Sequence, residues 1–197
     1  YNLSLEKDYE IVEIPYRKED INIGKETEFS GEFAFRAIVQ ACNLAINQEI
    51  EAIVTAPVSK NAMKMAGHNY NGQTEVLEQY LAQSNQKAEM IFVCDRFNVL
   101  LFTRHVALKD VAEKVKKEAI ISTVERLEKS LRLQLGIRYP KIAICALNPH
   151  AGENGMFGEE EINEIIPAVK YLKDKEINID GPFAADALFT NCAQNVC

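Results

Sequence analysis

The stretch Ile142-Ala143-Ile144-Cys145-Ala146-Leu147-Asn148-Pro149-His150-Ala151-Gly152-Glu153 joins an apolar run to a polar one. Its first five residues are apolar and predict a buried β-strand. Pro149 has no backbone N–H to give to a sheet, so strand pairing should end just before His150. An acidic, helix-like run begins at Glu159. The segment therefore predicts a strand that delivers polar side chains to the carboxyl end of a sheet, where open α/β proteins bind ligands.

The same residues also fit a plain loop between a strand and a helix, because such loops are commonly polar and rich in glycine. In that interpretation His150 is an incidental loop residue with no ligand to bind. The chemistry of the residues alone leaves both interpretations open.

Outside this segment, runs with strand character alternate with runs of helical periodicity. We expect strands at Tyr9–Pro15, Glu51–Thr55 and Ile177–Ile179, a hairpin from Met90–Cys94 and Asn98–Phe102, and helices at Ser30–Asn47, Ser59–Ala66, Gly72–Ala82 and Leu108–Leu135. Pro167 lies inside the following helical pattern and predicts a break there. This alternation predicts α/β layers with a mostly parallel sheet and one antiparallel pair.

The overall charge and hydropathy argue against several classes of partner. The chain has 197 residues, a formal net charge of -7 and no conspicuous basic run. We therefore expect neither nucleic acid nor an anionic membrane surface as a partner. No apolar stretch approaches the roughly 20 residues of a membrane span, and the first residues do not have the pattern of a signal peptide.

The chain contains five cysteines, an odd number. Cys42, Cys94 and Cys145 lie in apolar runs, so we expect them to be core thiols. Cys192 and Cys197 lie five positions apart near the C-terminal end of the sequence, and we do not interpret this pair as a zinc site. No cysteine lies in an electropositive loop, which disfavours a catalytic thiolate. These features predict a reduced, cytoplasmic protein.

Four polar residues follow predicted strands: Lys60, His105, His150 and Asp186. Enzymes with α/β folds assemble their sites from such strand-end loops. Two histidines cannot complete a zinc site, which takes three or four protein ligands. Either a further ligand comes from elsewhere, or the two histidines are structural. We expect the third histidine, His68, to be a solvated turn residue, and Glu159–Glu161 to be a charge run at a helix start.

Five segments carry a resemblance to a known family. They are Val54–Lys60 (VTAPVSK), Gly72–Glu75 (GQTE), Thr103–Leu108 (TRHVAL), Asn148–Glu153 (NPHAGE) and Gly181–Phe189 (GPFAADALF). In this order and spacing the chain, from about Ser30 to Phe189, resembles the PdxA family, the 4-hydroxythreonine-4-phosphate dehydrogenases of vitamin B6 synthesis. The last two segments together are highly specific.

The resemblance implies a three-layer α/β/α fold similar to the isocitrate and isopropylmalate dehydrogenases. It implies a homodimer with the active site at the interface. The implied reaction is the oxidation of 4-phosphohydroxy-L-threonine by NAD, or by NADP, followed by decarboxylation to 3-amino-2-oxopropyl phosphate. A divalent metal, zinc with magnesium or cobalt as alternatives, would polarise the reacting oxygen.

The resemblance also implies roles for individual residues. His105 and His150 match two of the three metal-binding histidines, and Asp186 and Lys60 match residues of the catalytic site. Gln73 and Thr74 match the substrate-binding segment. Gln73 replaces the histidine that is usual in the family, and an amide cannot titrate near neutral pH. No residue is assigned to the NAD site.

Two family segments have no counterpart in the chain: the glycine-rich opening segment, and the C-terminal segment with the third metal histidine. We therefore expect residues 1–197 to be an internal fragment, mainly the central α/β region, that is inactive alone. Two alternatives stay open. One is a paralogue that oxidises another phosphorylated hydroxy acid, and the other is a non-catalytic fragment that serves as a folding or dimerisation core.

Overall fold

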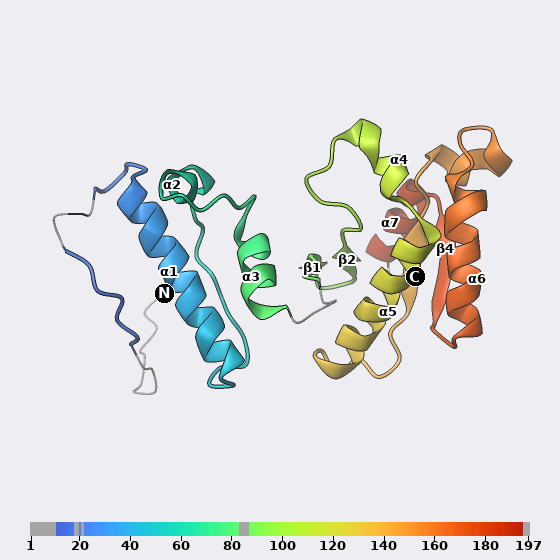
Figure 1. The fold of residues 1–197 in the computed structure, drawn as a ribbon. Coiled ribbons are helices and arrows are strands. Elements are labelled where there is room, and N and C mark those ends of the chain that lie inside the picture. The colour runs from blue at the N-terminus through green and yellow to red at the C-terminus, as the bar shows by residue number, and fades with distance from the viewer. Residues whose placement is uncertain (1–10, 18–19, 21, 83–86, 195–197) are drawn as a thin grey trace. The chain divides into compact units, whose positions relative to one another are not determined.

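The computed structural model describes residues 11–17, 20, 22–82 and 87–194. The chain divides into two compact units, Tyr1–Ala88 and Glu89–Cys197 (Figure 1). The first unit is helical in its described part, and the second combines helices with two pairs of strands. The α/β fold class expected from the sequence is confirmed.

Three helices pack together in the first unit: α1 (Glu28–Ile46), α2 (Lys60–Met65) and α3 (Gln73–Leu81). Their shared core consists of Ile38, Cys42, Met63 and Val76, all 5% exposed or less. The helices lie where the sequence predicted them. The start of α1 differs, because Thr27 and not Ser30 is the N-cap. Ser30 is the third helical residue, and its hydroxyl oxygen accepts the backbone N–H of Thr27, which completes a capping box.

Gly31 sets how closely α1 and α2 approach each other. A Cβ atom at this position would lie 2.0 Å from the backbone oxygen of Ala62. No side chain can be accommodated at that distance, so the bare glycine lets α1 rest directly on the backbone of α2.

Two predicted strands do not form in the residues that the structure describes. Residues 11–15 and the segment Glu51–Thr55 have no regular structure, and Val54 is 98% exposed; Tyr9 and Glu10 lie outside the described residues. A strand forms only against a hydrogen-bonded neighbour, and the described part of the first unit contains no other strand. The apolar pattern was therefore insufficient to predict strand formation.

Both strand pairs lie in the second unit. β1 (Ile91–Val93) and β2 (Asn98–Leu100) form the predicted antiparallel hairpin, with Phe92 opposite Val99. β3 (Ile142–Cys145) and β4 (Ile179–Phe183) are parallel, with Ile142 opposite Ile179 and an irregularity between Ala143 and Cys145. The last strand therefore begins where its predicted range ended and extends further.

The predicted long helix at Leu108–Leu135 is interrupted. A short 3₁₀ turn and α4 (Val111–Lys114) come first, and α5 (Lys117–Leu133) begins after Val115 and Lys116. The Glu164 carboxylate accepts the backbone N–H of Lys117 at 2.8 Å and the Lys116 ammonium at 3.0 Å. This carboxylate satisfies an N-terminal amide of α5, which explains why a new helix can begin there.

The main core of the second unit lies between α5, α6 (Ile166–Asp174) and the β3–β4 pair (Figure 1). Its buried members are Val115, Ile120, Val124, Ile142, Ile165, Ala168, Val169, Leu172 and Ile179. A π-helical turn at Glu161–Ile165 precedes α6, so the helical pattern changes next to Pro167, close to the predicted break. The last helix is α7 (Ala185–Ala193).

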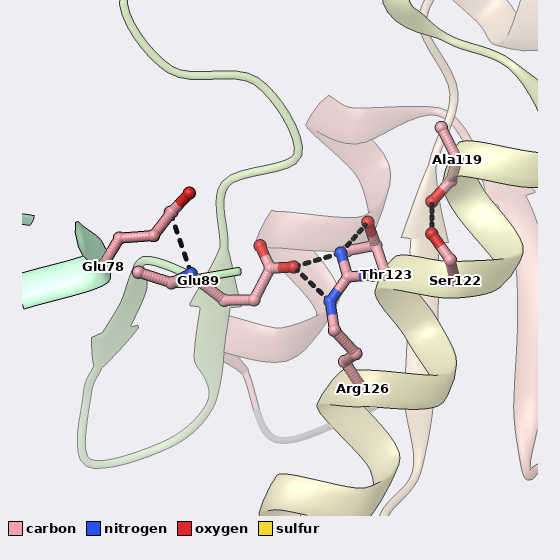
Figure 2. A network of polar contacts seen from close by, with 7 residues as sticks. Glu78, Glu89, Ala119, Ser122, Thr123 and Arg126 are labelled. Atoms are coloured by element: carbon pink, nitrogen blue, oxygen red, sulfur yellow. Dashed lines mark hydrogen bonds and ion pairs between the residues drawn. The ribbon is translucent and has the colours of Figure 1, made fainter. Parts of the chain in front are cut away.

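A polar network fixes the start of the hairpin to α5 (Figure 2). Arg126 of α5 donates two hydrogen bonds to Oε1 of Glu89, one of them from Nε at 2.9 Å, and a third to Thr123 Oγ1 at 3.1 Å. Glu89 lies two residues before β1. The network therefore gives the largely buried Thr123 hydroxyl a partner and holds the hairpin against the helix.

The cysteines only partly follow the sequence prediction. Cys42 is buried and Cys145 partly buried, and burial raises the pKa of both thiols. Cys94 is exposed, so its assignment to the core was wrong. Cys192 is disulfide-bonded, which the sequence reasoning did not anticipate. Among the described helices, none combines the length and apolar character that crossing a bilayer requires.

Candidate functional site

His150 lies on a turn with an unusual backbone. After β3 the chain is extended at Asn148, and the five residues His150–Asn154 then have φ values of 53, 55, 75, 42 and 56°. Left-handed conformation costs a residue with a side chain roughly 1–2 kcal/mol, and it normally occurs at single positions. Four of these five residues carry a side chain. Such a turn persists only where the surrounding structure holds it.

The buried side chain of Glu161 provides much of that support. Its Oε1 accepts the backbone N–H groups of Leu147 at 2.8 Å and of Asn148 at 2.7 Å. Its Oε2 accepts the Asn148 side-chain amide at 2.9 Å, and Glu160 accepts the same amide at 2.7 Å. The residue is 1% exposed. The two carboxylates thus bind the chain immediately before the left-handed turn.

Gly152 lies in the middle of the turn and close to the same carboxylate. A Cβ atom at this position would lie 2.7 Å from Glu161 Oε2. With a φ of 75°, the position is also one that glycine occupies at little cost. Glycine therefore allows the turn to fold down onto Glu161.

Two opposing effects act on the pKa of Glu161. Burial alone would raise the pKa of this carboxyl group. The hydrogen bonds from the backbone and side chain of Asn148 and from the backbone of Leu147 favour the ionised form, and together they lower the pKa below its ordinary value. Glu161 is therefore a buried anion at neutral pH.

His105 shares the backbone feature of His150. It follows the hairpin and has a φ of 53°, and both histidines are exposed. Residues with a side chain seldom have positive φ, although histidine does so more often than most. The ring of His150 lies near that of Phe157, with 6.3 Å between the centroids. Within the described ranges, no three His, Cys, Asp or Glu side chains are grouped so that they could hold a metal ion.

Asp186 lies at the same sheet edge as His150. It is exposed in the first turn of α7, directly after β4. Because β3 and β4 are parallel and Cys145 is opposite Phe183, the residues that follow both strands emerge at one edge. The backbone N–H of Ala146 extends the pairing by donating to Phe183 oxygen at 2.8 Å. The predicted convergence of strand ends thus holds for these two residues.

Lys60, Gln73 and Thr74 all belong to the first unit. The Gln73 amide donates to the Ala56 backbone oxygen at 2.7 Å and accepts a hydrogen bond from the Thr55 hydroxyl. Thr74 lies in the first turn of α3, and Lys60 is the first residue of α2. A Cβ atom at Gly72 would lie 3.8 Å from Lys60 Cε. The lysine stem and the Gly72–Glu75 segment are therefore neighbours, and the Gln73 amide is engaged within its own unit.

His68 is not the solvated turn residue that the sequence suggested. Its Nε2 lies 2.7 Å from the Glu32 carboxylate, and its ring stacks on Phe35 with 3.6 Å between the centroids. It therefore contributes to the packing of the first unit. Sequence reasoning also missed the support that Glu161 gives to the turn, because a glutamate in an acidic run looks like any other helix-start charge.

Comparisons with known proteins find similar sequences and structures. The family model described as "Pyridoxal phosphate biosynthetic protein PdxA" matches residues 3–197. The 4-hydroxythreonine-4-phosphate dehydrogenase of Trichlorobacter lovleyi is 40% identical over 170 residues, which cover 86% of this chain and 50% of that protein. The D-threonate 4-phosphate dehydrogenase of Cupriavidus necator is 39% identical over 172 residues, 87% of this chain and 51% of that protein.

A solved structure of a 4-hydroxythreonine-4-phosphate dehydrogenase is also similar to the chain. The crystal structure of 4-hydroxythreonine-4-phosphate dehydrogenase from Klebsiella pneumoniae matches with a TM-score of 0.80 and 33% identity, over 89% of this chain and 52% of that one. The chain thus spans about half the length of the curated relatives that it matches. The family model, in contrast, covers nearly all of it, and the chain therefore belongs to the PdxA family of pyridoxal phosphate biosynthetic proteins.

Proposed function

We propose that the full-length protein carrying this chain oxidises 4-phosphohydroxy-L-threonine with NAD or NADP. The oxidised product then loses carbon dioxide to give 3-amino-2-oxopropyl phosphate for pyridoxal phosphate synthesis. The observation that carries the proposal is His150, held on a left-handed turn at the carboxyl end of β3 within the segment Asn148–Glu153. Two relatives named 4-hydroxythreonine-4-phosphate dehydrogenase, at 40% and 37% identity, support this choice of substrate.

His105 and His150 would hold a divalent metal, for which zinc is the first choice. Imidazole nitrogen is a ligand that zinc accepts, and both residues are exposed. The described residues offer no group of three such ligands, so the remaining ligands would come from elsewhere in the full-length protein or its dimer partner. When bound, the metal would stabilise negative charge on the reacting oxygen.

The chain's other residues would position the substrate and move its proton. Asp186, at the same sheet edge as His150, would accept the proton of the substrate hydroxyl on a carboxylate oxygen. Lys60 would attract the substrate's carboxylate or phosphate, and the Thr74 hydroxyl would donate a hydrogen bond to it. Gln73 would support the substrate-binding segment Gly72–Glu75 mainly by holding the start of α3 to Thr55 and Ala56.

A second candidate substrate is D-threonate 4-phosphate. Relatives named D-threonate 4-phosphate dehydrogenase are 39% and 37% identical to the chain, close to the values for the first candidate. The two substrates share a phosphate, a carboxylate and a 3-hydroxyl group, and they differ in carrying an amine or a hydroxyl at carbon 2. Sequence identity therefore does not separate the two activities.

The test is NADH formation by the full-length protein from each substrate, with and without a chelator. We expect turnover of 4-phosphohydroxy-L-threonine that the chelator abolishes and added zinc restores. Turnover of D-threonate 4-phosphate alone would establish the paralogue. A folded, zinc-loaded dimer that turns over neither substrate would contradict the proposed activity and favour the non-catalytic alternative. Sedimentation of the same sample tests the proposed homodimer.

A further inference from the structure

The left-handed turn that carries His150 needs a support, and the structure contains one. The carboxylate of Glu161 contacts the chain on both sides of His150. Before the histidine it accepts the N–H groups of Leu147 and Asn148. After the histidine, it lies so close to Gly152 that a Cβ atom there would be 2.7 Å from Oε2.

A carboxylate suits this place better than a neutral side chain would. An ionised carboxylate only accepts hydrogen bonds, and its two oxygens can take several donors. Glu161 takes two backbone amides on one oxygen and the Asn148 side-chain amide on the other. A glutamine would direct an NH₂ group toward the NH₂ group of Asn148. Hydrogen bonds to a charged acceptor are also stronger than neutral ones.

We infer that Glu161 is a positioning residue for His150. It fixes the direction in which the chain leaves β3, and it supports the turn from which the imidazole projects. It acts through Leu147, Asn148 and Gly152. The inference rests on the proposed function only in giving His150 a metal to bind, because the contacts themselves are independent of that role.

Glu164, three residues after Glu161, offers a matched control. Both glutamates lie in the π-helical turn Glu161–Ile165, and both accept backbone N–H groups. Glu164, however, supports the start of α5. The variants Glu161→Gln and Glu164→Gln therefore each replace a carboxylate that accepts backbone N–H groups, from Leu147 and Asn148 in the first case and from Lys117 in the second. Of the two carboxylates, Glu161 binds the residues just before His150, so only its replacement is expected to disturb the turn.

The experiment uses the full-length protein and two measurements besides turnover. Cobalt(II) titration followed by visible absorption gives the metal affinity. Ring ¹H–¹⁵N correlation spectra of the metal-free protein report the surroundings of His150, including the nearby Phe157 ring. The His150 signals are assigned by their absence from the spectrum of His150→Gln. Thermal unfolding is measured for every variant.

We expect Glu161→Gln to weaken cobalt binding by about 10- to 100-fold, the usual effect of losing a residue that orients a ligand, and to shift the His150 signals. Glu164→Gln should lower the melting temperature and leave the cobalt affinity and the His150 signals unchanged. Wild-type affinity and signals in Glu161→Gln would overturn the inference, as would equal changes in Glu164→Gln.

Two further outcomes are also decisive. If the wild type neither binds metal nor turns over substrate, the proposed function fails, and the His150 signals of the metal-free protein still decide the positioning role. If Glu161→Gln does not fold, Glu161→Asp is judged by the same criteria. It keeps the buried charge but shortens the side chain by one methylene, so it should disturb His150 in the same direction.

Discussion

His150 is presented on a turn in which four residues with side chains have left-handed backbone conformations. This arrangement costs free energy and is retained where the position of a side chain matters. We expect His150→Ala to weaken zinc binding to the full-length protein by more than about 100-fold, beyond the usual effect of losing a supporting residue, and to abolish turnover. Isothermal titration with zinc and an NADH assay check both effects.

The matched control for this prediction is His68→Ala. His68 pairs with Glu32 and stacks on Phe35 in the first unit. Its loss should lower the melting temperature and leave zinc affinity unchanged. Zinc binding by His150→Ala at wild-type affinity would remove His150 from the ligand set.

The lowered pKa of Glu161 predicts how the stability of the protein depends on pH. The pKa of this carboxyl group is lower in the folded than in the unfolded protein, where a glutamate titrates near about 4.3. Its contribution is therefore fully present above that pH and is lost as pH falls through the folded-state pKa. We expect the stability difference between wild type and Glu161→Gln to be constant from pH 6 to 7 and to shrink below about pH 4. Urea unfolding across this range measures it, and a difference that grows on acidification would contradict the assignment.

At the scale of elements, α1 and α2 meet at Gly31. Alanine has a higher helix propensity than glycine by about 1 kcal/mol, so propensity alone predicts that Gly31→Ala stabilises α1. The new Cβ atom would instead lie 2.0 Å from Ala62 oxygen and force the helices apart. Overpacking of this kind typically costs about 1–3 kcal/mol. We therefore expect Gly31→Ala to lower the free energy of unfolding, as measured with urea. A higher free energy of unfolding would show that the two helices separate readily.

The elements differ in how far the sequence predicts them. The three helices of the first unit and the β1–β2 hairpin follow from local periodicity and turn residues, and the structure confirms them. The interruption at Val115 and Lys116 depends on Glu164, which is distant in sequence, so helical periodicity alone could not reveal it.

The sequence likewise predicts some features of the candidate site and not others. Local sequence indicates a polar loop after a buried strand, and the structure places His150 and Asp186 beyond the ends of adjacent parallel strands. The left-handed backbone and the supporting carboxylate are not predicted, because both depend on how Glu161 packs against the turn. The site roles assigned to Lys60, His105, His150, Gln73, Thr74 and Asp186 stay predictions.

At the scale of the whole molecule, the segment Glu51–Thr55 has a sequence typical of a buried strand and yet is irregular and largely exposed, with only Ile53 partly buried. Val54 is 98% exposed. The chain spans about half the length of its curated relatives. Since a strand needs a partner for its backbone groups, we expect the full-length protein to supply one.

Hydrogen exchange tests this expectation. Amides of Ile53, Val54 and Thr55 should exchange rapidly in the isolated 197-residue chain and at least about 100-fold more slowly in the full-length protein, because paired strand amides exchange only after opening. Val124, in the core face of α5, is the internal control and should be protected in both forms. Equally rapid exchange of the segment in both forms would mean that it does not pair as a strand and that its apolar residues remain at the surface. Protection that appears only on dimerisation would place the partner strand in the second subunit.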